Sequence, residues 1–473
     1  MSGTRKFSAD GGGPRQQRLD QQRSELASRV RRWTVDDFRW RMEELGIYRT
    51  YLTFENGVFN LAHPDLLEPV QAFFELSQDF GGHEGVFIGR EDNCDSLFFA
   101  FVHDTRRGLA QGGLRFWRYE TMSEVLVDGL RLAQGMTRKN ALANLWWGGG
   151  KGIITLPSRF QHPNEFGINT PELREERRRY FEAYGRFVAS LGGVYYTAED
   201  VGTFTPDMEA LLSQNRFTTC IPAVTGGSGN PSPFTARGVF RAMQAGWHFL
   251  DGGTLKGVKV SVQGAGNVGK PLIRELYQAG AEIWIADINP DNLAEIKKEL
   301  PKVHILADPE KVFDQRVDIF APCARGAVVN IDTIPRLKRQ GVKLVCGAAN
   351  NILKEPQDAD RLRENGIGYV PDFLCNRMGI VNCADEWMGY LKDDVQVAAE
   401  QVYPDTLRVF KHARNLVINT AKAADLLADI AAAELHPIMG HRGRRIIDNL
   451  MHSGWAEWDG RSLPAATAGK PAA

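Results

Sequence analysis

A lysine set among glycines carries the clearest chemical signal in the sequence. The stretch at 146–154 reads Trp146-Trp147-Gly148-Gly149-Gly150-Lys151-Gly152-Ile153-Ile154. Glycine has no side chain, so a ligand or a second backbone can approach closely. A lysine held there loses water, and desolvation favours its neutral, reactive form. The alternative is a flexible surface loop, but the flanking tryptophans and isoleucines favour a buried and reactive Lys151.

Two further charged side chains could share a site with Lys151. Lys139 lies twelve residues earlier, after an expected helix with an apolar face. Asp200 follows an expected strand at 194–197 and precedes a helix that starts at Thr205. Catalytic groups concentrate on such loops between a strand and a helix. An ordinary acidic residue at a helix entrance is the alternative for Asp200.

A third group of residues has the spacing of a dinucleotide site. The β-branched stretch 258–263 runs into Gly264-Ala265-Gly266-Asn267-Val268-Gly269, a helix follows, and the strand 283–286 ends at Asp287. This order is typical of Rossmann domains, where the glycines let a pyrophosphate approach the helix N-terminus. Asp287 can bind the ribose hydroxyls, and no arginine follows to meet a 2′-phosphate, which favours NAD over NADP. The alternative is a glycine-rich turn with an unrelated aspartate.

Two domains are needed to position these groups, and 473 residues suffice for two or three. The Gly/Pro/Ser cluster at 225–233 marks a boundary. We expect an α/β protein with a substrate-binding domain at 33–234 and a Rossmann domain at 235–397. The carboxyl ends of the later strands should place Ala324 and Asn351 near the cofactor.

The remaining segments lie at the two ends. Helices at about 398–456 are expected to pack back on the first domain. The polar residues 1–32 are expected to be disordered or partly helical, and 457–473 to be a disordered tail.

Composition excludes several classes of function. The 57 Lys and Arg nearly balance the 58 Asp and Glu, so no global attraction to nucleic acid or membrane is indicated. The six cysteines form no CxxC pair, and no metal site is expected. There is no apolar run that could span a bilayer and no signal-peptide core, so a cytoplasmic protein is expected.

The combined motifs resemble those of the glutamate/leucine/phenylalanine/valine dehydrogenases, and most of all their leucine dehydrogenase branch. The resemblance covers roughly residues 83–450. It rests on Gly112-Gly113-Leu114-Arg115, Met136-Thr137-Arg138-Lys139-Asn140, Gly148-Gly149-Gly150-Lys151, Thr197-Ala198-Glu199-Asp200-Val201-Gly202, Ser228-Gly229-Asn230-Pro231-Ser232-Pro233 and Gly264-Ala265-Gly266-Asn267-Val268-Gly269. It implies reversible oxidative deamination of an L-amino acid with NAD, giving a 2-oxo acid, ammonia and NADH, in a homo-oligomer.

The resemblance also implies roles for individual residues. Lys139 would hold the substrate carboxylate, Lys151 would be the catalytic lysine, and Asp200 would exchange protons with the amine. Thr235 would lie near the nicotinamide carboxamide and Asn351 near its ribose. Chemistry agrees, because the charge of Lys139 would lower the pKa of Lys151, and neutral Lys151 could activate water against an imine.

The sequence departs from this pattern around the substrate side chain. Gln111 precedes Gly112 and Gly113, where glutamate-specific relatives have lysine and leucine-type relatives have leucine. Cys383 should also line this pocket. Trp146, Trp147, Arg377 and Met378 are bulkier than the family pattern. They would either reshape the substrate pocket or reduce the activity. A neutral amino acid of the leucine, valine or phenylalanine kind is the expected substrate. The alternatives are a glutamate dehydrogenase and an NAD-binding regulatory protein.

Overall fold

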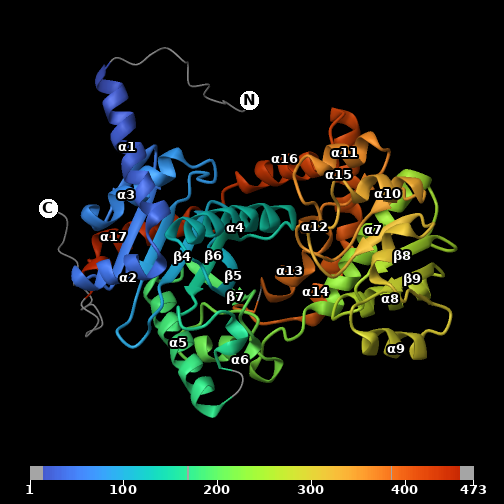
Figure 1. Cartoon of the computed structure of the whole chain (residues 1–473), viewed down its shortest axis with the longest axis horizontal. Helices are drawn as coiled ribbons and strands as arrows, with labels where there is room; N and C mark the ends of the chain where they lie inside the picture. Colours follow the sequence, from blue (N-terminus) through green and yellow to red (C-terminus); the bar gives the residue numbers. More distant parts are fainter. Residues whose placement is uncertain (1–13, 168–169, 385, 459–473) are drawn as a thin grey trace.

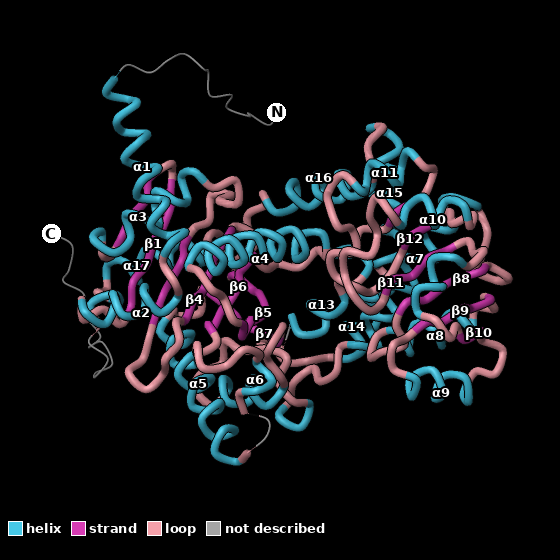
Figure 2. Tube along the Cα trace, viewed as in Figure 1, coloured by secondary structure: helices cyan, strands magenta, loops and turns pink. Residues whose placement is uncertain are grey.

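The computed structural model describes residues 14–167, 170–384 and 386–458 and arranges them in two α/β units (Figure 1). The strands gather in two separate groups, one in each unit (Figure 2). The α/β class expected from the sequence is therefore confirmed. Most of the expected C-terminal tail, 459–473, and the first part of the N-terminal one, 1–13, lie outside the described residues.

The first unit contains a mixed sheet with the strand order β2-β1-β3-β4-β6-β5-β7. Its strands are β1 (Arg49–Glu55), β2 (Val58–Leu61), β3 (Gly85–Gly89), β4 (Phe98–Asp104), β5 (Ala110–Trp117), β6 (Gly148–Thr155) and β7 (Tyr195–Glu199). Strand β5 lies between β6 and β7 and is parallel to both. The helices of this unit are α1 (Pro14–Arg32), α2 (Val35–Glu44), α3 (Pro64–Leu76), α4 (Met122–Leu142), α5 (Pro171–Ser190) and α6 (Thr205–Leu212).

Alternating apolar side chains bury both faces of this sheet. Phe99 and Phe101 of β4 pack into one core with helices α1 to α4. Phe98 and Ala100 point the other way, into a second core with α5 and α6. Successive side chains of a strand point to opposite faces, so one apolar run can serve two helical layers.

The glycine run at 148–152 is part of strand β6, fully buried, and is not a loop. Helix α4 lies directly against it. A Cβ on Gly149 would come 2.1 Å from Thr137 Oγ1 and 2.4 Å from the Ala133 carbonyl oxygen. The glycines therefore allow a helix and a strand to approach more closely than side chains permit, which agrees with the expected burial and not with the alternative of a surface loop.

The second unit contains a parallel sheet with the strand order β10-β9-β8-β11-β12-β13. Its strands are β8 (Lys259–Gln263), β9 (Glu282–Ala286), β10 (His304–Ile305), β11 (Ile319–Pro322), β12 (Leu344–Val345) and β13 (Gly368–Tyr369). Counted from β8, this is the order 3-2-1-4-5-6 of dinucleotide-binding folds, in which the ligand crevice opens between the first and fourth strands.

Helices and short 3-10 turns surround this sheet. The helices are α7 (Ser232–Asp251), α8 (Gly269–Gln278), α9 (Pro290–Glu299), α10 (Thr333–Arg339), α11 (Asp358–Glu364), α12 (Asp372–Cys375) and α13 (Met378–Ala384). The 3-10 turns in the described residues of both units are η1 (Pro163–Glu165), η2 (Ala223–Thr225), η3 (Pro309–Asp314) and η4 (Trp455–Glu457).

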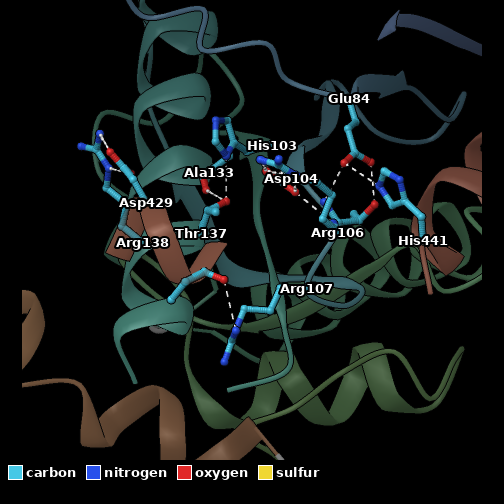
Figure 3. Close-up of polar contacts among 12 residues, drawn as sticks. Glu84, His103, Asp104, Arg106, Arg107, Ala133, Thr137, Arg138, Asp429 and His441 are labelled. Atoms are coloured by element: carbon cyan, nitrogen blue, oxygen red, sulfur yellow. Dashed lines mark hydrogen bonds and ion pairs between the residues drawn. The ribbon is translucent and has the colours of Figure 1, made fainter. Parts of the chain in front are cut away.

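The C-terminal helices are divided between the two units, although 398–456 was expected to pack back on the first. Helices α14 (Lys392–Glu400) and α15 (Val402–Leu416) pack against α7 of the second unit. Helix α16 (Thr420–Ala432) then crosses to α4, where Asp429 accepts a hydrogen bond from Arg138 at 2.8 Å (Figure 3). Helix α17 (Arg442–His452) joins the first unit's core.

The N-terminal helix α1 is anchored at one end. Its residues Ala27 and Val30 are buried in the core shared with α3 and α4. The part of residues 1–32 that the structure describes is thus helical and partly packed, because the buried Ala27 and Val30 lie in its last turns whereas Leu19, further forward, is 48% exposed. Among the described helices none is both long and apolar enough to cross a membrane.

Candidate active site

Lys151 and Asp200 meet at the centre of the first unit. Lys151 lies on β6 and its side chain is 5% exposed, while Asp200 directly follows β7 and its side chain is 30% exposed. The lysine donates a hydrogen bond to Asp200 Oδ2. Strand β5 separates the two strands, and Gly113 occupies the crossing point, where a Cβ would lie 2.6 Å from Asp200 Cβ. Gly113 therefore permits the pair to form.

The two groups perturb each other's titration. Burial lowers the pKa of Lys151 and the charge of Arg115 lowers it further, while Asp200 raises it. Burial raises the pKa of Asp200, but Lys151 and Arg115 outweigh this, and the pKa is lowered. A lysine that loses its proton more easily beside a carboxylate that stays charged is suited to proton transfer.

Arg115 is a neighbour of this pair that we did not assign from the sequence. Its Nε lies 3.8 Å from Asp200 Oδ2, and its Nη1 donates to Asp128 at 2.6 Å. Asp128 also accepts a hydrogen bond from Tyr119 at 2.6 Å. The sequence predicts that the charge of Lys139 lowers the pKa of Lys151. In the structure, the charge that lowers this pKa is that of Arg115. The signal was present, because Arg115 lies two residues after Gly113 on the same strand face.

Lys139 supplies a cation with no partner of its own. It lies in the last turn of α4 and is half-buried. Burial lowers its pKa, while the charges of Asp372 and Asp200 raise it, so Lys139 lies close to both units. Within the described part of the chain, the Lys139 ammonium has no hydrogen bond or ion pair. An unpaired cation there can bind an anionic ligand group.

Gln111 and Cys383, both of which the sequence predicts at the substrate pocket, lie next to each other. Gln111 is 1% exposed, and its Nε2 lies 4.0 Å from Cys383 Sγ. Gly112, which the sequence also predicts at the substrate pocket, has a structural role. A Cβ there would come 1.7 Å from the Gly150 carbonyl oxygen, so Gly112 allows β5 and β6 to pair. Among the described residues, the Gln111 Oε1 atom has no hydrogen-bond partner.

The glycine-rich turn after β8 has the form that a dinucleotide requires. Gly264 has φ +103°, and a Cβ on Gly269 would lie 2.1 Å from the Gly264 carbonyl oxygen. Above Gly266 there is nothing within 4 Å of a Cβ position. Helix α8 starts at Gly269 after Val268 with no side-chain cap, so its N-terminus can face a phosphate, although the Lys270 N–H already bonds the Gly266 carbonyl at 3.0 Å.

The other residues expected at the cofactor surround this turn. Asp287, at the end of β9, accepts a hydrogen bond from the Ala265 N–H at 2.6 Å. Ala324, which follows β11, lies 2.9 Å from the Cβ position of Gly264. The exposed Asn267 is part of the same turn. These contacts place three strand ends around one space.

Thr235 and Asn351 belong to other elements, since Thr235 lies in α7 and Asn351 follows β12. The Thr235 hydroxyl donates to the Pro231 carbonyl at 3.1 Å and lies 3.6 Å from the Cβ position of Gly379. Asn351 has φ +52°, and its carbonyl accepts a hydrogen bond from the Ala327 N–H at 2.6 Å. Neither side chain contacts Lys151 or Asp200 in the described structure.

The bulky departures from the family pattern are packed into the fold. Arg377 donates to the Leu142 carbonyl at 2.9 Å and to Asp405 at 2.5 Å. Met378 is buried against α7, 2.7 Å from the Cβ position of Gly238. These two side chains therefore make core contacts, and whether they reshape the pocket or reduce activity stays a prediction.

The tryptophans differ from each other. Trp146 is 40% exposed and stacks with Arg107, whose guanidinium carbon lies 4.1 Å from the ring centroid. Arg107 in turn bonds the Ala431 carbonyl at 3.1 Å, which ties it to α16 (Figure 3). Trp147 is buried against Tyr196, with ring centroids 4.9 Å apart. Of these two tryptophans, only Trp147 packs against Tyr196, which is the neighbour of Gln111 on β7.

Comparison with known proteins identifies the family. Residues 97–216 match the Glu/Leu/Phe/Val dehydrogenase dimerisation domain, and residues 226–436 match the glutamate/leucine/phenylalanine/valine dehydrogenase domain. The chain is 41% identical to leucine dehydrogenase of Geobacillus stearothermophilus over 69% of this chain and 84% of that one. It is 38% identical to valine dehydrogenase of Streptomyces coelicolor over 76% and 94%.

A solved structure agrees with these relatives. The L-tryptophan dehydrogenase from Nostoc punctiforme superposes with a TM-score of 0.64 and 32% identity, over 74% of this chain and 96% of that one. The family expected from the motifs is thereby confirmed, and with it an amino-acid dehydrogenase that uses a nicotinamide cofactor. The chain belongs to the glutamate/leucine/phenylalanine/valine dehydrogenase family.

Proposed function

We propose that this enzyme catalyses the reversible, NAD-dependent oxidative deamination of a neutral L-amino acid to a 2-oxo acid and ammonia. The observation that carries the proposal is the buried Lys151–Asp200 pair. The relatives named leucine and valine dehydrogenase support a neutral substrate.

Each charged residue has a separate task in this reaction. Lys139 binds the substrate carboxylate, because its ammonium has no partner within the described structure. Asp200 accepts a proton from the substrate ammonium, and its lowered pKa keeps it ionised for that step. Lys151, with its lowered pKa, then deprotonates the water that attacks the imine carbon. The nicotinamide, when bound, accepts the two electrons that leave the amino acid.

The cofactor assignment rests on Asp287. A carboxylate at the end of β9 favours the ribose hydroxyls of NAD and repels the 2′-phosphate of NADP, and Ile288 and Asn289 follow without an arginine. We expect Asp287→Ser to lower the NAD/NADP ratio of kcat/KM by tenfold or more, on the order of the 1.4 kcal/mol that such a factor represents. An unchanged ratio would contradict the assignment of NAD.

The absence of a positive charge at position 111 favours a neutral substrate over glutamate. A γ-carboxylate requires a cation at the end of the pocket, and position 111 carries a carboxamide. The alternative of a regulatory protein without activity is disfavoured, because Lys139, Lys151 and Asp200 are present and brought together.

We also propose a homo-oligomer, supported by the match to the dimerisation domain at 97–216. Native mass spectrometry would test this.

Turnover with a panel of 2-oxo acids tests the reaction. The oxidation of NADH with ammonia is measured for the wild type, for Lys151→Ala and for the control Arg131→Ala, whose side chain is 66% exposed and pairs with Asp79. We expect Lys151→Ala to lose at least about 10²-fold in kcat and the control to keep its activity. If the wild type binds NAD but turns over no acid, the enzymatic proposal fails. Preference for 2-oxoglutarate would favour a glutamate dehydrogenase.

A further inference from the structure

The carboxamide of Gln111 is buried, and only its NH2 group has a polar contact among the described residues. The side chain is 1% exposed, and its Oε1 atom has no partner among the described residues. The nearest polar contact of its Nε2 is the Cys383 sulfur at 4.0 Å, which is a weak acceptor. Buried amide oxygens are nearly always hydrogen-bonded, so an unpaired one in a site implies a ligand group.

The strand register places this carboxamide beside the reacting centre. Gln111 and Gly113 lie on the same face of β5, because side chains alternate along a strand. They are about 7 Å apart, twice the rise of one residue. Gly113 contacts Asp200, which is bonded to Lys151. A substrate whose α-carbon lies near that pair would extend its side chain along the strand to Gln111.

Cys383 decides which end of the carboxamide is free. The Cys383 thiol lies 3.5 Å from the Ile380 carbonyl and donates to it, so its sulfur remains as an acceptor. An acceptor holds the NH2 end of Gln111 and leaves the oxygen end unpaired. The site therefore presents a hydrogen-bond acceptor to the substrate side chain.

The walls around Gln111 are aromatic. Tyr196 is its register partner on β7, and the ring of Tyr196 packs against Trp147 and Trp387 with centroids 4.9 and 6.4 Å away. Such walls favour an apolar side-chain body that ends in one polar group. An aliphatic side chain would leave the Gln111 oxygen buried and unpaired, which is unfavourable.

We infer that the substrate is a neutral L-amino acid whose side chain carries an N–H or O–H donor, which Gln111 Oε1 accepts. This inference rests on the proposed function, and it makes Gln111 the residue that determines specificity. It distinguishes the enzyme from one that acts on leucine or valine, whose side chains have no donor. Indole, phenol and carboxamide groups are the side-chain classes that fit.

Three pairs of amino acids of similar shape test the inference. They are asparagine with leucine, tyrosine with phenylalanine, and tryptophan with 1-methyltryptophan, and only the first member of each has the donor. The kcat/KM of NAD reduction is measured for the wild type, for Gln111→Leu, and for the control Gln278→Leu on the exposed end of α8.

We expect the wild type and the control to prefer the donor in at least one pair by about ten- to a hundredfold. Gln111→Leu should abolish or reverse that preference and keep turnover of the apolar member. The inference is overturned if the wild type prefers the apolar member of every pair, a result that stands even where Gln111→Leu fails to fold. It is also overturned if an active Gln111→Leu keeps the wild-type ratios. Absence of turnover with every amino acid would instead overturn the proposed function.

Discussion

Lys151 reaches Asp200 across an entire strand, because the strand between them has a glycine at the crossing. The lysine comes from β6 and the aspartate follows β7, while Gly113 of β5 lies between them. The pair is thus held by three backbone segments and not by a flexible loop. Rigid strands hold two reacting groups in one geometry more accurately than loops do.

Replacing Arg115 should move the pH dependence of the enzyme upward. Arg115 lowers the pKa of both Lys151 and Asp200, so its loss raises both values. More alkaline solution is then needed to deprotonate Lys151. We expect the pH profile of kcat/KM for Arg115→Gln to shift to higher pH, with rate loss largest at neutral pH. Arg131→Gln, a surface change on α4, should leave the profile in place, and an unshifted Arg115→Gln profile would contradict this assignment.

Two glycines of α4 should respond oppositely to alanine. A Cβ on Gly129 would lie 2.2 Å from the buried ring of Phe101, while Gly135 has nothing within 4 Å. We expect Gly129→Ala to destabilise the fold by about 1–3 kcal/mol through overpacking. Gly135→Ala should stabilise it by about 0.5–1 kcal/mol through the better helix propensity. Urea denaturation followed by circular dichroism compares them, and equal effects would refute the close packing of α4.

Arg377 should contribute strongly to stability, in contrast to its neighbour Arg408. Both pair with Asp405, but Arg377 is 2% exposed and also bonds the Leu142 carbonyl, whereas Arg408 is 56% exposed. Removing the Arg377 guanidinium leaves the Leu142 carbonyl without this donor and Asp405 with the exposed Arg408, and breaking a buried ion pair costs about 3–5 kcal/mol. Arg377→Met should lose about that much in denaturant titrations. Arg408→Met should change stability by less than about 1 kcal/mol, and similar losses for both would argue against the buried contact.

A buried histidine pair should make the fold sensitive to acid. His83 and His103 have ring centroids 4.5 Å apart. Burial, and then the charge of His103, holds the pKa of His83 well below its usual 6.5. The unfolded chain therefore binds this proton more readily. The resulting stability is present above pH 6.5 and is lost as the pH falls below it, by at most about 1.4 kcal/mol per pH unit for one group.

His83→Gln tests this pH dependence. The variant should show a flatter decline of the free energy of unfolding between pH 7 and 5 than the wild type. His452→Gln, on the exposed end of α17, serves as the control. A wild type whose stability does not change over this range would contradict the buried neutral state of His83.

Local sequence patterns were sufficient for the second unit. The run from 258 to Asp287 predicted strand, turn, helix and strand, and the structure contains β8, α8 and β9 there. Each of these elements follows from neighbours in sequence, because parallel strands are buried apolar runs and the turn needs its glycines. The same patterns misplaced the helices after 398, since an apolar helical face does not indicate which unit it will cover.

What the sequence determined by itself was the set of reactive groups: Lys139, Lys151, Asp200 and the glycine-rich turn at 264–269. Their residue types and local context carry the chemistry, and no distant contact was needed to recognise them. Only the tertiary structure decided their relations. It made the glycine run a buried strand, placed Arg115 beside Asp200, packed Arg377 and Met378 into the core, and left the Gln111 oxygen without a partner among the described residues. Such contacts join residues far apart in the chain, and packing rather than local preference selects them.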